Sequence, residues 1–151
     1  MAKFDIQGFD KLMTELDRLG RFDEIAPKML EESVGILKEE VIKEASKHRD
    51  TGEMVESIKE TSAISGKGGG YYICVRPTGY ASGKKWKNSR TVRGKKAGKR
   101  ERVRNMEKLV YLEFGVKGRP ATPVLTTAVL NTERKVIAKM REVFNREVTG
   151  G

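Results

Sequence analysis

The residues best suited to chemistry are cations gathered into one segment. Between residues 81 and 104 there are eleven Lys or Arg residues and one acid, which gives a net charge of 11 − 1 = +10. The rest of the chain has 31 − 11 = 20 cationic and 21 − 1 = 20 acidic residues and is neutral. Ammonium and guanidinium groups bind phosphate and carboxylate oxygens. The candidate contact residues are Lys84, Lys85, Trp86, Lys87, Arg90, Arg93, Lys95, Lys96, Lys99, Arg100, Arg102 and Arg104.

Two kinds of partner are open for this basic arm, residues 81–104. Trp86 offers one stacking surface for a base, and no helix-turn-helix or RNA-binding signature accompanies it, so contact with a polyanion would not read sequence. An acidic protein surface would satisfy the same charges equally well. The segment has no apolar periodicity and its like charges repel. We therefore expect a mobile arm, or an extended hairpin tip, that becomes ordered against its partner.

The chain offers little for catalysis. His48 and Cys74 are the only His and Cys, so no Cys/His zinc site can be built within it. The Gly-rich stretch 65–70 lacks the spacing of a phosphate-binding loop, and no nucleophile-elbow or zinc-protease motif occurs. Glu113 is enclosed by apolar neighbours, and we expect it to bond N–H groups of a turn or an Arg. We predict no enzyme activity, no catalytic or metal-binding residue, no cofactor and no small-molecule substrate.

Hydrophobic periodicity predicts the elements that must hold the basic arm. Helical spacing predicts a helix ended by Gly20 and a longer one carrying the stripe from Leu30 to Ala45, with Asp23 as cap and Pro27 in or before the first turn. Runs 59–64 and 71–76 flank the Gly-rich loop and predict a β-hairpin, with 4–6 as a further candidate strand. We therefore predict an α+β fold in which a small antiparallel β-sheet packs against long amphipathic helices, with a long basic loop.

Three further details concern shorter segments. Residues 50 and 51 are candidate caps for a helical turn that runs from Met54 to Ile58. Residues 105–112 fit a helix capped by Asn105, although the alternation of apolar residues at 110, 112 and 114 would also suit a strand. We predict the helix.

The stretch from Tyr111 to Val129 predicts a fixed hinge. An apolar segment ends at Gly115, a turn rich in Gly and Pro follows, and a helix begins at Thr122-Pro123 and continues to about residue 148. Thr122 is the expected N-cap, and Pro123 suits the first helical position because its missing N–H would have no partner there. Polar residues 131–133 dilute the apolar face of this helix, so we expect its outer half to reach beyond the body.

Length and composition predict one domain over residues 1–148, with the basic arm inserted and a disordered tail at 149–151. No run approaches the ~20 apolar residues that span a bilayer. The first residues lack the apolar core of a signal peptide. We expect a protein made in the cytoplasm without membrane contact.

Three segments in order resemble the HK97 gp10-like family of tailed phages and prophages. The first is Phe4-Asp5-Ile6-Gln7-Gly8-Phe9-Asp10-Lys11-Leu12, and the second is Thr51-Gly52-Glu53-Met54-Val55-Glu56-Ser57-Ile58. The third is Tyr111-Leu112-Glu113-Phe114-Gly115, followed by Arg119-Pro120-Ala121-Thr122-Pro123 and the helix containing Ala128. Each motif alone is weak, and their order and spacing give the resemblance its specificity.

The resemblance implies a structural virion protein, a tail-completion or neck protein that joins the tail tube to the head–tail connector. It implies a ring of identical copies, with six as the expected number, that contacts a connector or neck protein and the tail tube or tail terminator protein. The location would be the virion tail or neck, after synthesis in the cytoplasm of a bacterial host. DNA in the channel is a further candidate partner, and a small non-specific nucleic-acid-binding protein is the alternative function.

The resemblance also points to residues that shape the hinge and the motifs. These are Thr51, Gly52, Ser57, Ile58, Glu113, Phe114, Gly115, Pro120 and Pro123. Two features depart from the family pattern. Val116 stands where Thr is usual, so a hydroxyl cap is lost there, and the basic arm is longer than the usual connection, so its role cannot be carried over.

Overall fold

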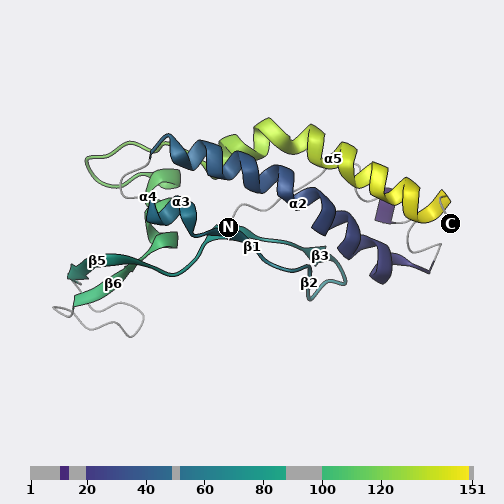
Figure 1. The fold of residues 1–151 in the computed structure, drawn as a ribbon, viewed down its shortest axis with the longest axis horizontal. Coiled ribbons are helices and arrows are strands. Elements are labelled where there is room, and N and C mark those ends of the chain that lie inside the picture. Colours follow the sequence, from purple (N-terminus) through teal and green to yellow (C-terminus); the bar gives the residue numbers. More distant parts are fainter. Residues whose placement is uncertain (1–10, 14–19, 49–51, 88–99, 150–151) are drawn as a thin grey trace.

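The computed structural model describes residues 11–13, 20–48, 52–87 and 100–149. Two long helices, α2 (Phe22–Ser46) and α5 (Leu125–Thr149), lie side by side along an elongated molecule (Figure 1). They run antiparallel. Near one end the Lys28 Nζ lies 2.8 Å from a Glu147 carboxylate oxygen, and near the other the Asn131 amide donates to Glu40 at 3.0 Å. The predicted α+β class is confirmed, because three small two-stranded antiparallel ladders accompany these helices.

Two clusters of buried side chains form the core along α2. One joins the first half of α2 to the last half of α5, and Leu12 and Met13 pack against it. The other joins the end of α2 to α3 (Glu53–Glu56), α4 (Asn105–Phe114) and the start of α5. The first cluster contains Phe22, Ile25, Ala26, Met29, Val136, Met140 and Val143. The second contains Val41, Ala45, Met54, Ile58, Leu109, Val124 and Ala128.

The expectation that the outer half of α5 reaches beyond the body is wrong. Ala128, Thr132, Val136, Met140 and Val143 are all buried, so one continuous stripe faces α2 at three-to-four spacing. Thr132 is polar but can be buried in this stripe, because its hydroxyl donates a hydrogen bond to the Ala128 carbonyl at 2.7 Å. The last residue of the helix is Thr149, one of the three expected in the tail.

The start of α2 also differs from the prediction. The N-cap is Arg21, not Asp23, and Pro27 lies at the sixth helical position, beyond the first turn. Pro27 has no N–H, so the helix loses one internal hydrogen bond there. Burial of Phe22 and Ile25 against α5 explains why the helix nevertheless begins so early. The Asp23 carboxylate instead accepts a hydrogen bond from the Tyr71 hydroxyl at 3.0 Å.

The predicted hairpin is confirmed, but as two short ladders. In the first, β1 (Ile58–Glu60) pairs with β4 (Val75–Pro77), and in the second, β2 (Ile64–Ser65) pairs with β3 (Tyr71–Tyr72). Between them the N–H of Thr61 donates to the Cys74 carbonyl at 2.9 Å. The hairpin packs beneath α2 (Figure 1). The candidate strand 4–6 lies outside the described residues.

Both described ends of the basic arm are strands. They are β5 (Tyr80–Lys87) and β6 (Arg100–Arg104), which form an antiparallel ladder that leads directly into α4. The helix predicted after the arm is confirmed, and its buried residues 105, 109 and 113 follow helical spacing. Asn105 is not its cap. The N-cap is Arg104, and the Asn105 side-chain amide donates to the Thr78 carbonyl at 2.8 Å.

Candidate functional site

The hinge between α4 and α5 is organised by Glu113. This carboxylate is buried at the end of α4, where it accepts hydrogen bonds from the backbone N–H groups of Leu125 and Thr126 at 2.8 and 3.0 Å. The Thr126 hydroxyl donates to it as well. These groups begin α5, so Glu113 caps a helix twelve residues further along the chain, where the helix dipole favours negative charge. The expectation that Glu113 bonds N–H groups is confirmed.

The predicted start of the C-terminal helix is wrong by two residues. The structure begins α5 at Leu125, and the first of its N–H groups bond Glu113, not Thr122. The Thr122 N–H donates to the Leu112 carbonyl at 2.7 Å, which ties the turn back onto α4. Pro123 precedes the helix and is exposed, and its carbonyl accepts a hydrogen bond from Thr127. A side chain from α4 therefore replaces the local cap that the sequence suggested.

Gly115 is required where α4 turns toward α5. Its φ is +71°, and a Cβ built there would lie 2.8 Å from the Ala121 nitrogen and 2.9 Å from the Arg119 oxygen. Both are backbone atoms and cannot move aside as a side-chain tip could. Pro120 lies within this close approach, while Val116 and Arg119 exchange hydrogen bonds at 3.0 and 2.8 Å. The turn is thus held from both sides.

The motif 51–58 lies at the same end of the molecule. Gly52, with φ +86°, is the N-cap of α3, in place of the residues 50 and 51 predicted for this role, which lie outside the described part. The Ser57 hydroxyl donates to the Met54 carbonyl at 2.8 Å, and the Ser57 carbonyl accepts from the Thr78 N–H at 2.9 Å. Ile58 and Met54 join the cluster that contains Val124. The structure therefore brings together two motifs that lie far apart in the sequence.

The basic arm approaches this hinge at the other end of α4. In the β5–β6 ladder, Tyr80 lies opposite Arg104, Lys85 opposite Arg102, and Lys87 opposite Arg100. Most of these positions carry cations, and like charges directly opposite each other destabilise a ladder. Buried Ala81 and Val103 attach the ladder to the body. Two of the remaining candidates, Lys84 and Trp86, belong to strand β5. The others, Arg90, Arg93, Lys95, Lys96 and Lys99, lie outside the described residues.

Tyr80 is a contact candidate that the sequence analysis missed. Its ring is half exposed, and the guanidinium carbons of Arg102 and Arg104 lie 4.8 and 6.0 Å from its centroid. An aromatic face flanked by guanidinium groups is suited to cation–π contact and to stacking. The missed signal was an aromatic residue at the border of the cationic segment. The ring supplies an exposed aromatic surface at the start of β5.

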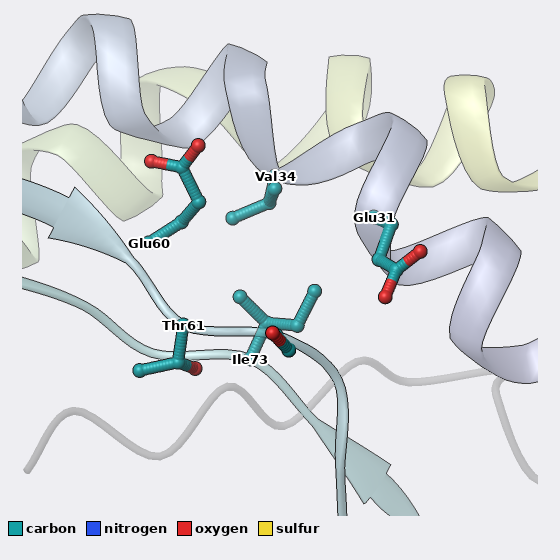
Figure 2. A pocket seen from close by; sticks show the side chains of 6 residues that line it. Glu31, Val34, Glu60, Thr61 and Ile73 are labelled. Atoms are coloured by element: carbon teal, nitrogen blue, oxygen red, sulfur yellow. The ribbon is translucent and has the colours of Figure 1, made fainter.

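A hollow of about 350 Å³ lies between α2 and the hairpin, lined by Glu31, Val34, Glu60, Thr61, Ser62 and Ile73 (Figure 2). In Figure 2 the side chains of Val34 and Ile73 face each other between the two carboxylates. One of these is paired, because the Lys38 Nζ lies 2.5 Å from Glu60. Within the described part of the chain, no group of three or more His, Cys, Asp or Glu residues could hold a metal ion.

The comparisons with known proteins now bear on this geometry. A family model for a component of phage tails matches residues 10–115, more than two thirds of the chain, and is described as "Bacteriophage HK97-gp10, putative tail-component". The chain therefore belongs to the HK97-gp10-like family of phage tail components. No curated protein and no solved structure matches. Among the described helices, none is both long and apolar enough to cross a membrane.

Membership of this family has consequences at a coarse level. A tail component works among other virion proteins, so such proteins are its partners, and the virion is the location that the family implies. The family is one of structural components, which implies a role without catalysis. The matched range covers the 51–58 motif, the β5–β6 ladder and α4, and it ends at Gly115. It therefore includes Glu113 but not the helix that Glu113 caps.

Proposed function

We propose that this protein is a tail-completion protein of the neck, which joins the tail tube to the head–tail connector as a ring of identical copies. Six copies is the number expected from the family resemblance. The carrying observation is the family match, together with the way two of its motifs, 51–58 and the hinge, meet in one buried cluster. A joining subunit needs surfaces held in fixed relation to each other, and the Glu113 cap and the Gly115 turn supply that rigidity. Residues 1–148 act as one domain in this proposal, without catalysis or cofactor.

The test of this proposal is the particle that forms without the protein. We expect heads and tails to assemble but to remain separate, as seen by negative-stain electron microscopy of lysates from a deletion phage. Restoring the gene should restore joined particles. Native mass spectrometry of the purified protein gives the number of copies in the ring. Normal infectious particles from the deletion phage would contradict the proposal.

We propose a second role for the basic arm, in which it projects from the ring and contacts an anionic partner. Its support is the ladder register, which sets Lys85 against Arg102 and Lys87 against Arg100. An anion between these pairs would relieve their repulsion. The two candidate partners are DNA in the channel and an acidic surface of the connector. Direct binding distinguishes them. If DNA is the partner, the purified protein should bind duplex DNA with an affinity that falls steeply with salt and ignores sequence. If the connector is the partner, the protein should bind the purified connector and leave duplex DNA unbound.

The alternative function, a small non-specific nucleic-acid-binding protein, draws on the same ladder and on the exposed Tyr80 ring between Arg102 and Arg104. The two functions differ in oligomeric state and in location. A monomer that binds DNA in solution and is absent from purified virions would favour the alternative. A ring found in the virion would favour tail completion.

A further inference from the structure

Phe114 stands out from the hinge because it has no place in the core. Its neighbours Glu113 and Gly115 are fixed by the helix cap and by the close approach of the backbone. Phe114 itself is 72% exposed. Since the residues on both sides cannot move freely, the backbone that presents this aromatic ring to solvent is held in place. The hinge thus exposes Phe114 to solvent, although the ring would be stabilised by burial.

Other exposed apolar residues adjoin it. Val110 and Tyr111 lie one turn earlier on α4, at the spacings that place side chains on one face, and Val116 follows the turn. We call these four residues the Phe114 surface. Single exposed apolar residues are ordinary, but a contiguous group on a soluble protein marks a contact site. Leu130 on α5 is comparably exposed, at 71%, and serves below as a comparison residue.

Three cations lie close in sequence to the Phe114 surface. Lys108 lies on α4 three residues before Tyr111, and Lys117 and Arg119 are exposed in the turn. Within the described part of the chain, none of these three has a carboxylate in ion-pair contact. The surface therefore combines an apolar centre with a positive rim. Its complement would be an apolar hollow with a negative rim.

The hollow between α2 and the hairpin offers two facing apolar side chains and one carboxylate that is unpaired within the described part of the chain, and it is also lined by Thr61, Ser62 and the Glu60 that pairs with Lys38 (Figure 2). Val34 and Ile73 supply apolar walls, and Glu31 and Glu60 lie at its sides. Glu31 is exposed and, among the described residues, has no ion-pair partner. The hollow is open to solvent, and its volume of about 350 Å³ leaves room for an aromatic ring.

We propose that Phe114 of one copy enters this hollow of a second copy, with Lys117 of the first copy facing Glu31 of the second. The inference rests on the ring proposed above and names its subunit contact. The Phe114 surface belongs to α4 and the hollow to α2 and the hairpin, and α4 and the β2–β3 ladder lie toward opposite ends of the molecule (Figure 1). Two different surfaces in contact form a head-to-tail interface, and such a contact closes into a ring when the rotation allows.

The rigidity of the Phe114 surface favours this use. Binding costs less when the contacting side chain is already held in place, and the residues that dominate interfaces are aromatic anchors seated in pockets. Loss of such an anchor should therefore weaken each contact by about 30-fold or more.

The first test compares the oligomeric mass of the full chain with that of Phe114→Ala and Leu130→Ala, by light scattering over a range of concentrations. We expect an oligomer for the wild type and for Leu130→Ala, and a shift toward monomer for Phe114→Ala. At dilutions where all three proteins are monomeric they should melt at nearly the same temperature, because Phe114 contributes little to the core; at higher concentration Phe114→Ala should melt lower, since it lacks the stabilisation from association. A lower melting temperature for monomeric Phe114→Ala would contradict the exposed position on which the proposal depends.

The second test uses charge. Lys117→Glu and Glu31→Lys should each weaken the oligomer, and a chain carrying both substitutions should recover, because the pair is restored with its signs exchanged. Recovery is not expected if either residue acts only within its own subunit. Absence of recovery in the double variant would overturn the assigned pairing.

The outcomes also separate this contact from the ring itself. A wild-type chain that stays monomeric at every concentration contradicts both. An oligomer whose mass is unchanged by Phe114→Ala and Phe114→Glu contradicts the contact alone. If these variants keep the oligomer but fail to enter tails, the Phe114 surface binds another virion protein, and the second-copy proposal is wrong.

Discussion

The two ends of α4 differ in how the charged groups beside them are paired. At its C-terminal end, the Glu113 carboxylate accepts hydrogen bonds from the start of α5, and backbone atoms fill the space beside Gly115. At its N-terminal end, the β5–β6 ladder sets cations opposite cations. The first region is specified by contacts within its own chain, whereas in the second the strand register itself sets like charges opposite each other. The hinge therefore contains residues that define the fold, and the ladder is the place to look for a binding partner.

The largest effect is expected from Gly115→Ala, which tests whether the hinge is as tightly specified as its contacts indicate. A Cβ would meet backbone atoms at 2.8 and 2.9 Å, and φ is +71°. We expect a loss of about 3 kcal/mol in the free energy of unfolding, from overpacking and from the unfavourable backbone conformation together. Urea denaturation followed by circular dichroism measures it.

Gly118→Ala is the matched control for this prediction. Its φ is +82°, but a Cβ there would meet nothing within 4 Å. Only the conformational cost should remain, about 1 kcal/mol. Equal losses in the two variants would mean that close approach of the backbone is not what Gly115 provides.

Glu113→Ala should have the next largest effect. Removal of the carboxylate leaves the N–H groups of Leu125 and Thr126 without their acceptor at a partly buried helix start. We expect a loss of about 2 kcal/mol, in the range of a lost cap and an unsatisfied buried donor. Glu113→Gln, which keeps one acceptor oxygen, should lose less. Glu142→Ala, on the exposed face of α5, is the control, and a loss as large there would remove the special status of Glu113.

Sequence patterns were sufficient for the features that depend on local chemistry. The hairpin, the helix from 105 and the role of Glu113 as an acceptor of N–H bonds follow from residue types and spacing alone. The errors came where a distant contact outweighs a local rule. Pro27 lies inside α2 because Phe22 and Ile25 gain burial against α5. Thr122 does not cap α5 because a carboxylate from α4 already occupies the helix start.

The candidate site divides in the same way. The unequal distribution of charge could be read from composition, and so could the cationic positions. The ladder register, the placement of Tyr80 beside Arg102 and the outward position of Phe114 depend on which residues the fold buries, which no local pattern contains.

The pairing of α2 with α5 is expected to respond to acid, unlike the cation-rich ladder. A hydrogen bond from Arg146 lowers the pKa of Glu32, and one from Lys28 lowers the pKa of Glu147, both from the ordinary value of 4.5. Because these pKa values are lower in the folded chain, the unfolded chain takes up protons first as the pH falls. The stabilisation is complete above pH 4.5 and is lost as the pH falls through the folded-state values.

Melting temperatures at pH 7, 5 and 3 (roughly the range that titrates these carboxylates) measure this effect. The wild type should lose more on acidification than Glu32→Gln, which has no charge to lose at that position. The difference should be small, because exposed ion pairs contribute little. A parallel decline in the two proteins would exclude this pair as a source of the acid response.

The smallest effect on stability is expected from a variant that should have a large effect on binding. Lys85→Gln with Lys87→Gln removes the cations opposite Arg102 and Arg100. Relief of the repulsion should leave stability unchanged or raise it by a few tenths, up to about 0.5 kcal/mol. Binding to duplex DNA should weaken, and the slope of log affinity against log salt should fall by about 2 if each residue contacts one phosphate. Salt titration of fluorescence anisotropy measures both quantities.

Lys67→Gln with Lys135→Gln is the matched control, because it removes the same charge from exposed positions that lie in no strand. If net charge alone attracts DNA, both double variants should weaken binding equally. If the ladder is the contact, only the first should reduce the salt slope. A ladder variant that loses stability and keeps its affinity would reverse the comparison. The cations of the ladder would then be paired within the chain. The ladder, like the hinge, would be stabilised by its own contacts and would need no partner.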